Sequence, residues 1–125
     1  MADQDKRSTV LFMRRWAPTV LYIVMIMVMA ARPAPKLPHL KHVDKYLHAL
    51  AYGILAVLSF RSFSGTGFGH VAVLTLSMGI LVGLADEGIQ LLSRMRTASL
   101  YDLLADVIGV SVGILASMVY RKHRH

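Results

Sequence analysis

Residues 70–92, HVAVLTLSMGILVGLADEGIQLL, form a long apolar run that carries acidic and amide side chains only near its end. An α-helix needs about 20 consecutive, mostly apolar residues to cross the hydrocarbon core of a bilayer, and this run has that length. It therefore predicts a membrane-spanning helix whose polar residues Asp86, Glu87 and Gln90 lie close to one membrane face.

The composition of the whole chain also favours a membrane protein. The 125 residues are enough for one domain, 55% of them are hydrophobic and the mean hydropathy is +0.52, which is too apolar for an ordinary soluble domain. The sequence has no cysteine, which excludes disulfides, thiolate metal ligands and a cysteine nucleophile. The net charge of +7 comes mostly from basic residues beside the apolar blocks, so we expect no nucleic-acid binding.

The chain divides into four apolar blocks separated by short polar links. The link RPAPKLP contains three prolines that stop a helix, and SGTGFG is a flexible turn. We expect an all-α integral membrane bundle of four transmembrane helices with both termini on the same side. Its parts are a polar N-terminal segment at 1–10, a four-helix domain at 11–120 with spans at about 11–31, 44–63, 70–92 and 99–120, and a basic tail at 121–125.

The basic residues predict the orientation of this bundle. Lys and Arg are more frequent on the cytoplasmic side of membrane proteins. Eight lie on the side of the termini and six on the opposite side. The eight are Lys6, Arg7, Arg14, Arg15, Arg61, Arg121, Lys122 and Arg124, and the six are Arg32, Lys36, Lys41, Lys45, Arg94 and Arg96. We therefore expect cytoplasmic termini.

Polar residues of three blocks gather at one level of the membrane. Up-and-down threading of four spans places the start of the second span, the end of the third and the start of the fourth on the side opposite the termini. The residues concerned are Asp44, His48, Asp86, Glu87, Gln90, Arg96, Asp102 and Asp106. Ionisable residues inside membrane spans are costly and mark functional sites, so this level is the predicted site.

Some of these residues also have structural interpretations. Asp44 would cap the N-terminus of the second span, and Ser99 with Asp102 matches an S-x-x-D capping box. A neutral His48 that is hydrogen-bonded to a neighbouring helix is as good an explanation as a catalytic histidine. Structural and functional interpretations of these residues therefore stay open at the level of sequence.

Asp106 has no comparable structural interpretation, because it lies about 10 Å along the helix from Ser99 at 1.5 Å per residue. It shares one stripe with Asp102, Gly109 and Gly113, at spacings of four, three and four residues. The glycines permit the close approach of a neighbouring helix. We expect the third span to be that neighbour.

Up to five carboxylates at one level would repel one another without compensation. Arg96 would compensate this negative charge through a bidentate pair. A divalent ion such as Mn, Mg or Zn would compensate it by binding carboxylates and an imidazole. The acids Asp86 and Glu87 would alternatively extend to the membrane surface from a helix end. No tightly spaced motif such as H-E-x-x-H occurs, so the sequence leaves the metal and any cofactor unknown.

The segments DKYLHALAYGILAVL, residues 44–58, and GLADEGIQLLSRMRTASLYDLLADVIGVSVG, residues 83–113, resemble the VanZ-like membrane proteins. That family's pattern runs D-K-x-x-H in one helix, D/E-E-x-x-Q near the end of the next, then R-x-x-S-x-x-D and an Asn followed by glycines. The matching positions are Asp44, Lys45, His48, Glu87, Gln90, Arg96, Ser99, Asp102, Gly109 and Gly113. Asp106 departs from the pattern, because the family often has Asn there.

The resemblance implies a small polytopic protein of the bacterial inner membrane with a cell-envelope role, and one member links the family to glycopeptide resistance. It brings no accepted reaction, so whether the chain is an enzyme stays undecided. The first hypothesis is a polar pocket that binds or processes a lipid-linked or cell-wall substrate. The alternatives are a structural or assembly subunit and a proton-coupled transporter. The small-residue stripes fit internal packing and a homo-oligomer equally well.

In the first hypothesis His48 is a general acid or base, which Glu87 or Asp102 orients, and Arg96 binds an anionic headgroup or phosphate. The predicted catalytic residues are therefore His48, Glu87 and Asp102, and the predicted binding residues are Asp44, Gln90, Arg96 and Asp106.

Overall fold

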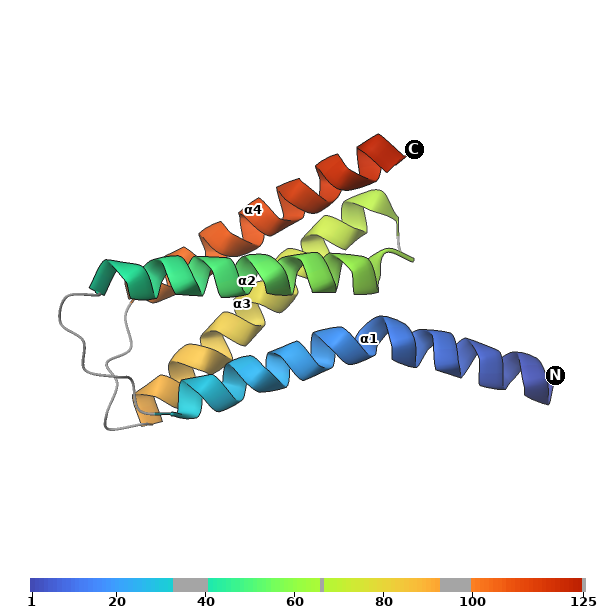
Figure 1. Ribbon diagram of the computed structural model, residues 1–125, viewed down its shortest axis with the longest axis horizontal. Coiled ribbons are helices and arrows are strands. Elements are labelled where there is room, and N and C mark those ends of the chain that lie inside the picture. The colour runs from blue at the N-terminus through green and yellow to red at the C-terminus, as the bar shows by residue number, and fades with distance from the viewer. Residues whose placement is uncertain (33–40, 66, 93–99, 125) are drawn as a thin grey trace.

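The protein consists of four α-helices (Figure 1) in a computed structural model that describes residues 1–32, 41–65, 67–92 and 100–124. The helices are α1 (Ala2–Ala31), α2 (Lys41–Phe63), α3 (Phe68–Leu92) and α4 (Leu100–Arg124). Each is long and apolar enough to cross a membrane. The predicted all-α bundle of four transmembrane helices is confirmed.

The outer faces of the helices are apolar. Large hydrophobic side chains are exposed along all four helices, among them Leu21, Leu47, Leu81, Ile108 and Leu115. In water such a continuous apolar surface would aggregate, whereas in a bilayer it faces lipid chains of the same polarity. The chain is therefore an integral membrane protein.

The closest helix pair is α2 with α4. A Cβ atom added to Gly109 would collide with the carbonyl oxygen of Ala49, and one added to Gly113 would lie 2.5 Å from the carbonyl oxygen of Gly53. The two backbones approach this closely because glycine carries no side chain. We expected the third span to be the helix that packs closely against Gly109 and Gly113. That expectation was wrong, because the stripe of these glycines faces α2.

The third helix meets α4 through a different glycine. A Cβ atom at Gly79 would lie 2.5 Å from Cγ2 of Val110. The buried core lies mainly between α2, α3 and α4, and α1 adds Ile26 to it. The other large buried members are Tyr52, Leu55, Phe60, Val71, Val82, Val110 and Ile114.

Helix α1 contacts α2 and α3, and among the described residues it has no contact with α4. It begins at Ala2, so residues 2–10 of the polar N-terminal segment are helical. Figure 1 shows that α1 bends part-way along its length. Pro18 lies inside the helix and lacks the N–H group that would bond to the preceding turn, which accounts for such a bend.

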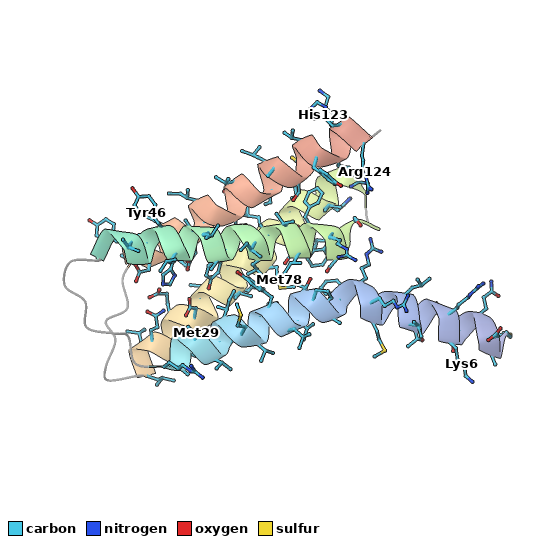
Figure 2. The ribbon with its side chains drawn as sticks, viewed as in Figure 1. Lys6, Met29, Tyr46, Met78, His123 and Arg124 are labelled. Carbon is cyan, nitrogen blue, oxygen red and sulfur yellow. The ribbon has the colours of Figure 1, made fainter. Side chains whose placement is uncertain are left out.

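The two ends of the bundle differ in chemistry. Figure 1 shows both chain termini and the turn between α2 and α3 at one end. Figure 2 shows Lys6 on the part of α1 that extends beyond the other helices, and His123 and Arg124 at the end of α4. The opposite end contains the start of α2, the end of α3 and the start of α4, where the sequence predicted the site.

Candidate functional site

Three helices bring polar side chains to one depth of the bundle. His48 lies seven residues after the start of α2 at Lys41, and Asp106 lies six residues after the start of α4 at Leu100. Asp86 lies six residues before the end of α3 at Leu92. At 1.5 Å per residue each position is about 10 Å from the helix end, so the predicted common level is present in the structure.

His48 and Asp106 join α2 to α4. Nδ1 of His48 lies 3.0 Å from Oδ1 of Asp106, which is hydrogen-bond distance. The histidine side chain is 14% exposed and the aspartate 1%. A carboxylate that accepts a hydrogen bond from one ring nitrogen fixes the tautomer and orientation of the imidazole, so Asp106 is placed to hold His48.

A second hydrogen-bonded group joins α2 to α3. The hydroxyl of Tyr52 donates to Oδ2 of Asp86 at 3.1 Å, and Nε2 of Gln90 donates to Oδ1 of the same carboxylate at 3.0 Å. All three residues are buried. Because each oxygen of Asp86 accepts a hydrogen bond, the orientation of this carboxylate is fixed on both sides.

The two groups are in contact with each other. The rings of His48 and Tyr52 lie nearly parallel, with an angle of 8° and 6.4 Å between their centroids. A Cβ atom at Gly83 on α3 would lie 3.4 Å from Oδ2 of Asp106 and 3.7 Å from Cε1 of Tyr52. The absence of a side chain at Gly83 therefore lets α3 approach both residues. We call His48, Tyr52, Asp86, Gln90 and Asp106 the polar cluster.

The polar cluster contains one carboxylate oxygen that is not satisfied. Oδ2 of Asp106 is buried and has no hydrogen-bond partner among the described residues. A buried acceptor without a donor costs about 1–3 kcal/mol, and more when it is charged. A proton, a water molecule, an ion or a substrate group at this position would satisfy the atom.

The structure brings some of the predicted site residues together. His48, Gln90 and Asp106 belong to the polar cluster, and Asp106 has the orienting position that we predicted for Glu87 or Asp102. Glu87 and Asp102 are buried on α3 and α4. Arg96 and the capping residue Ser99 lie outside the described residues, as does the side chain of Asp44.

Two acidic residues lie in the first turn of a helix. Helix α2 begins at Lys41, so the backbone of Asp44 lies inside its first turn. An N-cap residue precedes the first helical residue. Asp102 lies in the first turn of α4, where its charge favourably meets the positive end of the helix dipole.

Two residues of the polar cluster were not among the predicted catalytic and binding residues, although Asp86 was expected at the same membrane level. Tyr52 follows His48 by one helical turn, and Asp86 precedes Gln90 by one turn. Both pairs therefore share a helix face with a predicted site residue. That spacing was the available signal, and the sequence alone did not show which face would point into the bundle.

A separate polar group lies at the other end of the bundle. The hydroxyls of Thr19 and Ser62 are 2.7 Å apart, and Ser62 donates to the carbonyl oxygen of Arg15 at 3.1 Å. The guanidinium of Arg15 donates to Oγ of Ser64 at 2.5 Å. These bonds join α1 to α2 near Pro18, where the helix of α1 is disturbed. This group, which consists of Arg15, Thr19, Ser62 and Ser64, contains no acid.

A model of the VanZ/LLP1 family matches residues 8–121. The chain belongs to the VanZ/LLP1 family. The polar cluster of this VanZ/LLP1 protein lies wholly inside the matched range, and the predicted resemblance to VanZ-like proteins is confirmed.

A curated relative occurs outside bacteria. An uncharacterized protein of the fission yeast Schizosaccharomyces pombe is 28% identical over 105 residues, which are 83% of this chain and 64% of the relative. The chain thus spans slightly less than two thirds of the relative's length. No solved structure matches the chain.

Proposed function

We propose that this VanZ/LLP1 protein binds a membrane lipid or lipid-linked envelope molecule, with the polar headgroup at the polar cluster and an acyl or isoprenoid chain beside α2 and α4. The observation that carries the proposal is an apolar groove of about 550 Å³ between these helices. Such a groove on the lipid-facing surface of a bundle suits a hydrocarbon chain that enters sideways from the bilayer.

The groove begins next to the polar cluster. Ala49, which directly follows His48, lines it on α2, and Gly109, three residues after Asp106, lines it on α4. Its wall includes Val112, which is exposed on the outer surface of α4. A molecule with a polar head and an apolar tail would therefore find both environments within one helical turn of each other.

The paired His48 and Asp106 support chemistry on the headgroup. A histidine held by a buried carboxylate accepts or delivers a proton effectively near neutral pH. In this proposal Asp106 is a positioning residue and His48 is the general acid or base. Tyr52 and Asp86, which are hydrogen-bonded to each other, would supply hydroxyl and carboxylate oxygens to the bound head.

One alternative is a structural or assembly subunit, and the polar hydrogen bonds between helices give it a specific basis. His48 with Asp106 and Tyr52 with Asp86 would then fix helix packing alone. A proton-coupled transporter is less well supported. Between the two polar groups the described interior consists mainly of apolar side chains such as Leu55, Val71 and Val110. The buried hydroxyls of Ser59 and Thr75 interrupt it, but no buried acid of the described residues lies there.

Lipid retention in the purified protein tests the proposal. Protein extracted directly from its membrane into polymer nanodiscs or mild detergent is separated from bulk lipid, and the retained lipid is identified by mass spectrometry. We expect about one retained molecule of a defined headgroup class per chain. The substitution Val112→Trp fills the groove from outside and should lower lipid retention about tenfold. The reason is that blocking one apolar contact surface removes roughly 1–2 kcal/mol of the binding free energy.

The matched control is Leu115→Trp, because Leu115 is equally exposed on α4 but does not line the groove. It should retain lipid like the wild type. If both tryptophan variants retain the same amount of lipid, the lipid does not bind in the groove. His48→Gln separates binding from chemistry, because it should retain the lipid and lose any conversion of it. Variants at His48 that lose only membrane yield and thermal stability would support the structural alternative.

A further inference from the structure

The polar cluster contains a set of potential metal ligands. His48, Asp86 and Asp106 each offer one nitrogen or oxygen atom, and these three atoms lie within 4.8 Å of one another. Metal–ligand bonds of about 2.0–2.2 Å place neighbouring ligand atoms about 3–4 Å apart. Small side-chain movements would therefore bring the three atoms onto one ion.

An independent feature points into the same space. Oδ2 of Asp106 has no hydrogen-bond partner among the described residues, and Asp106 is only 1% exposed. This oxygen faces Gly83, which lies three residues before Asp86 on the same side of α3. The unsatisfied oxygen is thus directed towards the helix face that carries the second carboxylate.

The charge balance of the cluster also favours a cation. Asp86 and Asp106 are both buried at membrane depth, where two carboxylates without compensation are strongly unfavourable. One divalent cation with a neutral histidine makes the set electrically neutral. The hydrogen bonds from Tyr52 and Gln90 to Asp86 correspond to the outer contacts that orient carboxylate ligands in metal sites.

We infer that His48, Asp86 and Asp106 form a binding site for one divalent first-row transition-metal ion, such as Mn²⁺ or Zn²⁺. One imidazole nitrogen and two carboxylate oxygens are ligands that these ions accept, whereas Mg²⁺ and Ca²⁺ prefer oxygen ligands alone. Three protein ligands leave at least one coordination position for an oxygen of a bound headgroup. The inference rests on the proposed function for the headgroup and changes one role in it: with an ion bound, His48 would be a ligand, and the ion would replace His48 as the group that acts on the headgroup. Cation binding itself does not require lipid.

Metal titration of the purified full chain tests the inference. The protein carries an affinity tag without histidine, because His123 near the C-terminus would otherwise add to a histidine tag. After dialysis against chelator it is titrated with Mn²⁺, and free Mn²⁺ is followed by electron paramagnetic resonance. We expect about one bound ion per chain, and at least about tenfold weaker binding in His48→Gln, Asp86→Asn and Asp106→Asn.

Matched controls replace the same residue types at exposed positions. His70→Gln and Asp5→Asn should bind Mn²⁺ like the wild type, because both side chains are exposed and far from the cluster in sequence. A second measurement uses the wild type alone, whose thermal unfolding midpoint should rise with Mn²⁺ or Zn²⁺ and fall again with chelator. This arm remains informative if a cluster variant does not fold.

Two results would overturn the metal site. One is a wild-type chain that binds neither Mn²⁺ nor Zn²⁺ and shows no shift of its unfolding midpoint. The other is a bound ion whose affinity is unchanged in folded cluster variants. Lipid retention is measured on the same metal-free protein, so retention without metal binding would reject this site and leave the proposed lipid function in place.

Discussion

Nδ1 of His48 lies 3.0 Å from Oδ1 of Asp106, directly beside the closest backbone contact of the bundle. Ala49, whose carbonyl oxygen faces Gly109, is the next residue after His48, and Gly109 lies three residues after Asp106. The close glycine contact and the polar contact therefore belong to one helix–helix interface. Whatever separates α2 from α4 will also separate the histidine from its carboxylate.

Substitution of Asp106 should distinguish its charge from its hydrogen bond. Asp106→Asn keeps an acceptor oxygen for His48 and the shape of the side chain, and the related pattern often carries Asn here. We expect a free energy of unfolding within about 1 kcal/mol of the wild type. Asp106→Ala leaves the imidazole without this partner and should cost about 1–3 kcal/mol. Denaturant-induced unfolding in mixed micelles measures both values.

A double-mutant cycle checks the reason for that difference. If His48 and Asp106 interact as described, His48→Ala combined with Asp106→Ala should cost less than the two single changes added together, by about 0.5–3 kcal/mol. Additive costs, or equal costs for Asp106→Asn and Asp106→Ala, would show that the contact does not contribute to stability.

The hydroxyl of Tyr52 should be needed for the stability of the bundle. Tyr52→Phe keeps the buried ring and removes the donor to Oδ2 of Asp86, a carboxylate that is itself buried. We expect a loss of about 1–3 kcal/mol in the free energy of unfolding, because the acceptor stays buried without its donor. The control Tyr46→Phe changes an exposed tyrosine on the same helix and should change stability by less than about 0.5 kcal/mol.

One result would contradict the stabilising role of the Tyr52 hydroxyl. If Tyr52→Phe and Tyr46→Phe unfold at the same denaturant concentration, the hydrogen bond to Asp86 does not stabilise the fold. Combining Tyr52→Phe with Asp86→Asn should then also show no coupling.

The sequence predicted the helices and the depth of the site, and these follow from the lengths of the apolar runs. It did not predict the pairing of His48 with Asp106, because pairing depends on how each helix is rotated about its axis. That rotation is set by tertiary contacts such as Gly109 against Ala49, which sequence spacing does not reveal. For the same reason the stripe of Gly109 and Gly113 was assigned to the wrong neighbour.

The difference between Asp86 and Glu87 shows the same limit. Adjacent acids on a helix point about 100° apart, and the sequence could not decide which one would face Tyr52. Both acids fit the D/E-E of the family pattern, and Asp86 accepts the hydrogen bond from Tyr52 that joins α2 to α3. A position that was not among the predicted catalytic and binding residues thus became central once α2 and α3 were placed together.

The glycine contact itself can be tested by adding one methyl group. Gly109→Ala places a Cβ atom against the carbonyl oxygen of Ala49, and this backbone atom cannot move without moving α2. We expect a loss of about 1–3 kcal/mol in the free energy of unfolding, as for other overpacked interiors. Gly88→Ala is the matched control, because a Cβ atom there meets nothing within 4 Å, and it should be neutral or slightly stabilising. Equal stability of the two variants would contradict the close packing of α2 with α4.

The side of the membrane on which the polar cluster lies can be determined with single cysteines, since the natural chain has none. Arg32 follows α1 at the end of the bundle that carries the cluster, and His123 lies near the end of α4 at the opposite end; both are exposed. From the excess of basic residues beside the termini we expect a membrane-impermeant maleimide to label Arg32→Cys in intact cells and His123→Cys only after permeabilisation. The reverse pattern would place the polar cluster in the cytoplasmic leaflet and redirect the search for its substrate to lipids of that leaflet. Labelling of both variants from one side would contradict four membrane crossings, because an odd number of spans separates the two positions.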